Sequence, residues 1–200
     1  MSTSELYGAL VVYAIIGGLE LVDRTNFSLI ALAARNSPLA TFAGGAIAFI
    51  ASTALAVSIG TALVTALGPS RIGILRVAGG AFLIAYAIWL FSRPVEEGAV
   101  SRTGHSALLT ALAVTFLLEL GDTTMIFQIV FVATYGGWIV LIAGAAGLIT
   151  AAAVGTTIGR HVGLRVRPAL LQKIVVVVLV AVGVVTILYG LEPRLLSWVG

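Results

Sequence analysis

Residues 20–25 read Glu-Leu-Val-Asp-Arg-Thr, and residues 119–124 read Glu-Leu-Gly-Asp-Thr-Thr. Both stretches lie inside long apolar segments, and they contain four of the eight acidic residues of the chain: Glu20, Asp23, Glu119 and Asp122. An ionisable side chain is costly in lipid, so it is rarely placed there without a function. The two matched pairs therefore predict a cation site built from two halves of one protein.

The composition around these stretches is that of an integral membrane protein. The 200 residues are 60% hydrophobic and only 10% charged, whereas a soluble domain averages about 25% charged residues. Runs such as 174–187 do not alternate between polar and apolar residues, which argues against a transmembrane barrel and favours helices. The net charge of +3 comes from loop arginines and indicates no nucleic-acid partner, and the absence of cysteine excludes thiolate metal sites.

Six membrane-spanning helices can be drawn, with all five prolines in loops or at span ends. The predicted spans are Leu6–Ala34, Leu39–Leu67, Ile72–Phe91, Ser106–Thr134, Trp138–Gly159 and Ala169–Leu191. A helix needs roughly 20 residues to cross a bilayer, so the first, second and fourth spans should be tilted, broken or extended. A polar central loop, 93–105, separates repeat 1 (1–92) from repeat 2 (106–200).

The two motifs are separated by a constant offset, since 119 − 20 = 99 and 122 − 23 = 99. The same offset relates Gly45 to Gly144 and Gly60 to Gly159. Three predicted spans separate the copies, and an odd number means that the second copy crosses the membrane in the opposite direction. We therefore predict an all-α membrane protein of two inverted three-helix repeats, as in many secondary transporters, with the site near the midplane.

Basic residues gather on one side of these predicted spans. Seven of them follow the first, third and fifth spans: Arg35, Arg93, Arg102, Arg160, Arg165, Arg167 and Lys173. The other side has three: Arg71, Arg76 and Arg194. The positive-inside rule then predicts that the first side is cytoplasmic and that both termini lie outside. No convincing signal or transit peptide is visible, which favours a prokaryotic plasma membrane.

The motif spacing predicts how the acids are presented. Residues three apart lie about 60° apart around a helix, so we expect Glu20 and Asp23 to share a face, and Glu119 and Asp122 likewise. Four carboxylates at one point cannot all be ionised in a low dielectric. They must hold protons, a cation, or each in turn, which is the physical basis of proton-coupled exchange.

Further donors flank the acids. Thr25 and Thr124 supply hydroxyl oxygens and Asn26 an amide oxygen, while Met125 is the thioether counterpart of Asn26. Arg24 is expected to temper the charge of the first copy only. Oxygen ligands of this kind suit the hard cations Ca²⁺, Mg²⁺ and Mn²⁺.

Other readings stay open beside this one. Intramembrane acids can pair only to hold helices together, and Gly155–Gly159 is most simply a helix-packing motif. Gln128 lies well round the helix from Glu119, which favours packing over a pore, and His105 is expected in the solvated loop. The sequence shows neither a nucleophile–base set, which would indicate an enzyme, nor a phosphate-binding loop, which would indicate an ATP-driven pump. No cofactor is expected.

The motifs resemble the Glu-x-Gly-Asp-(Lys/Arg)-(Thr/Ser) sequence that occurs twice in a family of cation–proton exchangers of bacteria, chloroplasts and the Golgi, within the lysine-exporter superfamily. The resemblance covers nearly the whole chain and implies exchange of Mn²⁺ or Ca²⁺ for protons. The four acids match the motif acids, and further matches are Arg24, Thr25, Gly121 and Thr124. Two positions depart, with Val22 in place of glycine and Thr123 in place of a basic residue.

Two alternatives belong to different classes. One is an exporter of amino acids or other small solutes, although four central acids disfavour a carboxylate substrate unless a metal bridges it. The other is a membrane scaffold that transports nothing, in which the acids are paired structurally.

Overall fold

A computed structural model describes residues 2–68, 72–92, 106–161 and 168–191, and within them every regular element is a helix. The elements in chain order are α1 (Thr3–Leu21), α2 (Arg24–Arg35), α3 (Pro38–Leu67), α4 (Ile72–Phe91), α5 (Ala107–Glu119), α6 (Thr123–Tyr135), α7 (Gly137–Ile139), the π-helix η2 (Val140–Gly144), α8 (Ala145–His161) and α9 (Pro168–Leu191). The predicted central loop with His105, and most of the predicted basic loops, lie outside the described residues.

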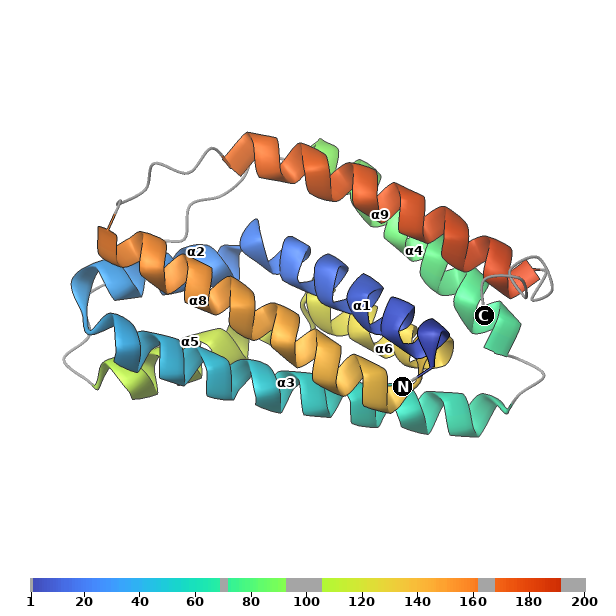
Figure 1. Ribbon diagram of the computed structural model, residues 1–200, viewed down its shortest axis with the longest axis horizontal. Helices are drawn as coiled ribbons and strands as arrows, with labels where there is room; N and C mark the ends of the chain where they lie inside the picture. The colour runs from blue at the N-terminus through green and yellow to red at the C-terminus, as the bar shows by residue number, and fades with distance from the viewer. Residues whose placement is uncertain (1, 69–71, 93–105, 162–167, 192–200) are drawn as a thin grey trace.

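Successive helices run back and forth along the long axis of the molecule (Figure 1). The α1–α2 segment leads away from the end that holds the N-terminus, and α5–α6 runs in the opposite direction. The N-terminus and the end of α9 lie at the same end of the molecule. The prediction of an all-helical protein is therefore confirmed for the described residues.

Two of the three long predicted spans are broken at the acidic motifs. Helix α1 ends at Leu21 and α2 begins at Arg24, while α5 and α6 are bent by 62° at their break. The third long span, Pro38–Leu67, is one helix of 30 residues. We expected the Glu and Asp of each motif to share a helix face, and this was wrong, because each Glu lies in the last turn of one helix and each Asp occupies the N-cap position of the next. The breaks agree with the expectation that the first and fourth spans are tilted, broken or extended.

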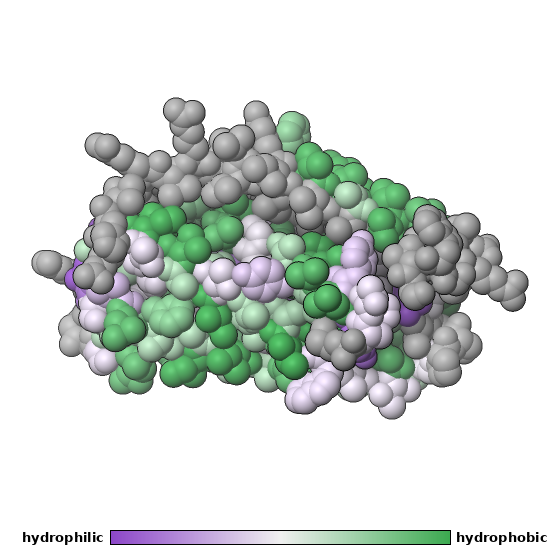
Figure 2. Space-filling view, in the orientation of Figure 1, coloured by the Kyte–Doolittle hydropathy of each residue, from purple (hydrophilic) through white to green (hydrophobic). Residues whose placement is uncertain are grey.

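The described helices have membrane-compatible lengths and surfaces. Three segments are long and apolar enough to cross a membrane, namely Thr3–Leu21, Pro38–Leu67 and Gly137–Gly159, and the bent pair α5–α6 adds a fourth if it counts as one span. Apolar side chains cover much of the described part of the face in Figure 2. The structure therefore supports membrane insertion without fixing the number of spans.

Helices of the two halves pack against each other through glycines at corresponding positions. A Cβ atom at Gly60 of α3 would lie 3.0 Å from the carbonyl oxygen of Ile129 on α6, and Gly159 of α8 approaches Ile30 of α2 in the same way. These partners obey the sequence offset, since 60 + 99 = 159 and 30 + 99 = 129. Only glycine permits backbones this close.

Helices α4 and α9 form a separate pair along one side of the molecule (Figure 1). They meet at Gly80 and Gly183, where a Cβ atom on Gly80 would lie 2.6 Å from the Gly183 carbonyl oxygen. The remaining helices form a bundle around the two breaks. Arg76 of α4 connects the pair to the bundle by donating from Nε and Nη2 to the Ala133 carbonyl oxygen near the end of α6, at 3.2 and 3.1 Å.

Candidate functional site

The two helix breaks share one backbone hydrogen bond and one capping position. In each motif the Asp amide donates a hydrogen bond to the carbonyl oxygen of the Glu three residues earlier, at 3.1 Å for Asp23 and for Asp122. Each Asp then occupies the N-cap position of the next helix, where Asp is among the preferred residues. The Asp23 carboxylate also accepts the Thr25 amide at 3.0 Å, which satisfies a free N–H of the first turn of α2.

The two glutamates are completely buried, each with 0% exposure. Thr124 Oγ1 donates to Glu119 Oε1, whereas both carboxylate oxygens of Glu20, the second oxygen of Glu119 and the Thr25 hydroxyl have no hydrogen-bond partner among the described residues. Buried polar groups are normally paired, because an unpaired one costs about 1–3 kcal/mol. These unpaired oxygens are what a site for a cation or a proton requires.

A pocket joins the two breaks. It is lined by Leu19, Val22, Asp23, Tyr86, Asp122, Thr123 and Thr124. The aspartates, which are 122 − 23 = 99 residues apart in sequence, therefore face one space. The fully buried glutamates are not among its lining residues, so the four acids form two pairs of different accessibility.

Arg24 connects the two motifs. Its Nη2 atom lies 3.5 Å from Asp122 Oδ1, and the two side chains are 57% and 10% exposed. Arg24 was expected to temper the charge of its own motif, but the structure pairs it with the aspartate of the other motif. The corresponding position of the second motif holds Thr123, so no reciprocal ion pair with Asp23 can form there.

Comparison with protein families identifies the family of the chain. The family model described as "Divalent cation/proton antiporter GDT1" matches residues 8–97 and 107–194. The chain belongs to the divalent cation/proton antiporter GDT1 family. The suspected family is thus confirmed, and the two matched stretches begin 107 − 8 = 99 residues apart, the offset of the acidic motifs. Comparisons with curated proteins and with solved structures return no match.

Val22 stands where the motif of the GDT1 family has glycine, and the backbone conformation explains why a valine is tolerated there. Gly121 has φ +75°, a left-handed conformation that favours glycine, but Val22 has φ −108°, which any residue adopts. Val22 is also buried in the hydrophobic core. The first break therefore has no need of the glycine that the family motif has at this position.

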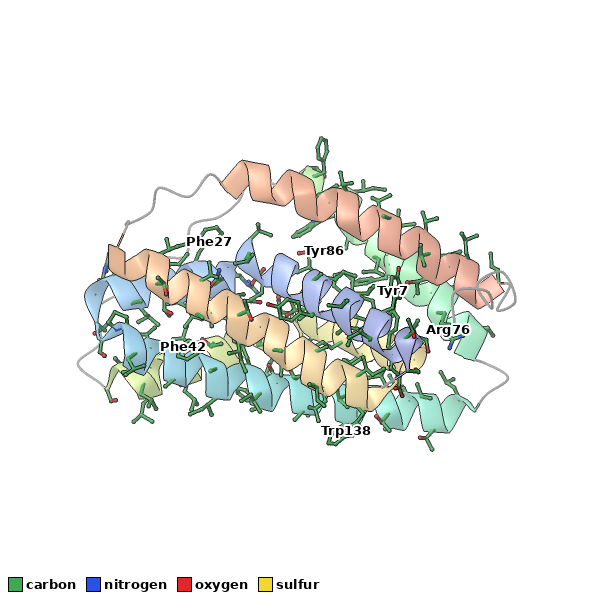
Figure 3. All side chains as sticks on the ribbon, in the orientation of Figure 1. Tyr7, Phe27, Phe42, Arg76, Tyr86 and Trp138 are labelled. Atoms are coloured by element: carbon green, nitrogen blue, oxygen red, sulfur yellow. The ribbon has the colours of Figure 1, made fainter. Side chains whose placement is uncertain are left out.

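Tyr86 is a pocket residue that sequence reasoning missed. It projects from α4 towards α1 (Figure 3), and its ring packs edge-on against Phe127 of α6 with centroids 5.8 Å apart. Its hydroxyl lies beside Thr123. The available signal was a hydroxyl-bearing side chain within the apolar segment 72–91, but nothing in the sequence placed that segment beside the motifs.

The remaining predicted ligands lie close by but do not line the pocket. Asn26 is 2% exposed, and its Oδ1 atom lies against Gly155 of α8. Met125 is 7% exposed, and its sulfur accepts the Gly121 amide at 3.3 Å. Gly155 and Gly159 both contact α2, so the packing interpretation of the Gly155–Gly159 motif is confirmed.

The acids do not form a closed cage in this structure. Within the described residues no three His, Cys, Asp or Glu side chains are close enough together to hold a metal ion. The structure brings the two aspartates to one pocket and keeps Glu20 and Glu119 buried apart from it.

Proposed function

We propose that this chain is a secondary transporter that exchanges Mn²⁺ or Ca²⁺ for protons through a site shared by its two halves. The proposed site acids are Glu20, Asp23, Glu119 and Asp122. The observation that carries the proposal is that both helix breaks open onto one pocket with an aspartate from each. Family membership supports the cation and proton as substrates.

The C-terminal ends of α1 and α5 bring partial negative charge to the breaks, and the carboxylates of Asp23 and Asp122 offset the partial positive charge at the N-terminal ends of α2 and α6. The C-terminal ends of α1 and α5 stop at the motifs, and a helix C-terminus carries a partial negative charge. Interrupted helices whose free carbonyl groups bind a cation recur in secondary transporters. In the proposed cycle a divalent cation neutralises two carboxylates as protons leave, and protons replace it on the return step.

We further propose six membrane spans arranged as two inverted repeats, with both termini outside. The opposed directions of α1–α2 and α5–α6 support this arrangement, as does the common end for the N-terminus and α9 (Figure 1). The glycine contacts that recur at an offset of 99 residues support it as well. In this arrangement each half supplies one break to a site near the midplane.

The test is ion exchange by the purified protein in proteoliposomes with a pH-sensitive dye inside. External Mn²⁺ or Ca²⁺ should make the lumen more alkaline as protons leave, and Mg²⁺ serves as a comparison cation. Glu119→Gln keeps the side-chain volume and the bond from Thr124 but removes the charge, so this variant should insert normally and lose exchange. The same is expected of Glu20→Gln, Asp23→Asn and Asp122→Asn.

Each outcome separates the proposal from its rivals. Wild-type exchange rates in two or more of the four neutral variants would end the shared-site proposal. Amino-acid efflux without cation-driven proton movement would indicate the solute exporter. If the wild-type protein moves neither an ion nor a solute, the alternative of a membrane scaffold that transports nothing is favoured.

A further inference from the structure

One side chain at the pocket between the breaks comes from neither motif. Among the described residues that line the pocket, six lie at the ends of the broken helices, and the seventh is Tyr86 of α4. Helix α4 belongs to the separate α4–α9 pair, so Tyr86 brings a third part of the fold to the proposed site (Figure 3). The pocket therefore has a wall that the two halves of the motif do not supply.

Aromatic neighbours hold the ring of Tyr86 in place. It packs edge-on against Phe127 of α6, with centroids 5.8 Å apart, and it lies beside Phe82 and Trp89 of its own helix at 6.5 and 5.4 Å. Phe127 is fully buried. Edge-on and offset pairs at such distances are favoured arrangements of aromatic rings. The ring is thus a wall with a defined position.

The pocket beside this wall is small. Its cavity volume is about 20 Å³, and a cavity needs roughly 10–15 Å³ to hold one water molecule. A single bare cation therefore fits, whereas a cation that keeps a shell of several water molecules does not. A cation that occupies this pocket must exchange its water molecules for oxygen atoms of the protein.

Oxygen atoms for this exchange are present at the pocket. Asp23 and Asp122 both line it, and Asp122 Oδ2 has no hydrogen-bond partner among the described residues. The hydroxyl groups of Thr123 and Tyr86 lie beside each other there. Ca²⁺ accepts about six to eight oxygen ligands in a flexible geometry, but Mg²⁺ dehydrates reluctantly and usually keeps several waters. Mn²⁺ is larger than Mg²⁺ and binds the same oxygen donors.

The second half of the protein offers no equivalent wall. At the offset of 99 residues Val185 of α9 corresponds to Tyr86, since 86 + 99 = 185. Val185 is 43% exposed and is not one of the residues that line the pocket. The α4 side of the pocket therefore depends on one side chain, and valine is the residue that the other half has at the corresponding position.

We propose that Tyr86 is a specificity-determining residue of the exchange site, because its ring limits the pocket to one dehydrated cation and thereby excludes Mg²⁺. The proposal rests on the proposed exchange function and extends the site from the motifs to α4. The carboxylates cannot make this distinction by charge, since Mg²⁺, Mn²⁺ and Ca²⁺ carry the same charge. The size of the pocket can, and size is one of the properties by which proteins separate Ca²⁺ from Mg²⁺.

Tyr86→Val is the sharpest test, because it removes the ring and installs the residue of the second half. In proteoliposomes the wild type should exchange Mn²⁺ or Ca²⁺ for protons and Mg²⁺ poorly. In the variant, the Mg²⁺ rate relative to that of the better of the other two cations should rise about tenfold or more, a typical effect of a changed pocket size. A damaged fold would lose exchange of every cation, so a gained activity reports on the pocket.

Two further variants isolate the ring. Tyr86→Phe keeps the ring and its packing against Phe127, so it should keep the discrimination against Mg²⁺. Tyr13→Val is the matched control, since Tyr13 of α1 donates to the Thr150 hydroxyl at 3.1 Å and does not line the pocket. Wild-type discrimination in Tyr86→Val would overturn the proposal, and so would an equal gain of Mg²⁺ exchange in Tyr86→Phe or Tyr13→Val.

Cation binding gives a second readout that does not depend on transport. A cation that binds the folded protein raises its unfolding temperature. In detergent, Mn²⁺ or Ca²⁺ should stabilise the wild type more than Mg²⁺ at the same concentration, and this difference should shrink in Tyr86→Val. Tyr86→Leu, which also removes the ring, repeats the test if Tyr86→Val does not fold.

Failure of the exchange function is distinguishable from failure of the size limit. If the wild type exchanges no cation for protons, the proposed function is wrong, and the shifts in unfolding temperature alone decide whether Tyr86 selects the bound ion. If the wild type exchanges Mg²⁺ as fast as Mn²⁺ and Ca²⁺, the exchange function stands and the role of Tyr86 is refuted.

Discussion

Asp122 has a positive charge of the protein itself beside it, because Arg24 Nη2 lies 3.5 Å from its Oδ1 atom. A cation that binds Asp122 must therefore compete with Arg24. The guanidinium is more than half exposed, so the pair is worth at most about 1 kcal/mol. Arg24 is thus expected to modulate cation affinity at Asp122, whereas the sequence predicted that it would act on its own motif, which contains Asp23.

Replacing Arg24 by glutamine should make cation binding tighter. Removal of the competing charge is expected to lower the KM for the transported cation by about two- to fivefold, the range that a partly exposed ion pair allows. The measurement is the cation dependence of exchange in proteoliposomes. Arg35→Gln is the control, since Arg35 lies at the other end of α2. A KM that rises, or moves equally in both variants, contradicts the competition.

Met125 provides a test of ion selectivity. A thioether contributes little to Ca²⁺, which takes oxygen ligands, while Mn²⁺ tolerates sulfur better. If Met125 joins the ion during transport, Met125→Asn should shift the Mn²⁺/Ca²⁺ rate ratio towards Ca²⁺. In the structure the sulfur instead accepts the Gly121 amide. An unchanged ratio with activity retained would leave Met125 as a residue that supports the break.

The four candidate acids could be selected from the sequence, because charged residues in apolar segments stand out, and the structure places all four at the two helix breaks. Their pairing could not be, since the Arg24–Asp122 contact depends on how two distant breaks meet. Tyr86 was invisible for the same reason. Glu119 and Thr124 were both predicted from the sequence as metal ligands. Their hydrogen bond to each other could not be predicted, because it depends on the break between α5 and α6.

At the scale of elements, the breaks are the features that sequence reasoning located least well. The ends at Leu67, Phe91 and Leu191 were predicted correctly because glycine, proline and polar residues follow them. The breaks lie within apolar segments, where hydropathy carries no signal. The usable signals were Asp23 and Asp122, which are typical N-cap residues, and Gly121 just before the second.

Gly121→Ala should destabilise the second break. A side chain at φ +75° costs about 1–2 kcal/mol, so the free energy of unfolding in detergent should fall by about 1 kcal/mol. Gly18→Ala in the last turn of α1 should be neutral or stabilising, because alanine is the better helix former. Equal stability of the Gly121→Ala variant and the wild type would show that the break does not require this backbone conformation.

At the scale of the whole molecule, the proposed orientation can be tested by labelling, because the chain has no native cysteine. By the positive-inside rule, seven basic residues against three predict that Gly163 lies on the cytoplasmic side. In intact cells, Ser2→Cys should react with an impermeant maleimide and Gly163→Cys should not, while both should react after permeabilisation. The opposite pattern would reverse the orientation.

The ion pair of Arg24 with Asp122 has no symmetric counterpart, because Thr123 occupies the position of Arg24 in the second motif. This asymmetry has a kinetic consequence. Two identical halves would make the inward-facing and outward-facing forms equal in energy. In the proposed inverted-repeat arrangement, a contact between the halves that is worth up to about 1 kcal/mol and has no symmetric counterpart makes the form that contains it up to about fivefold more populated at rest. The gradients still fix where transport stops, but turnover should be faster in one direction than in the other.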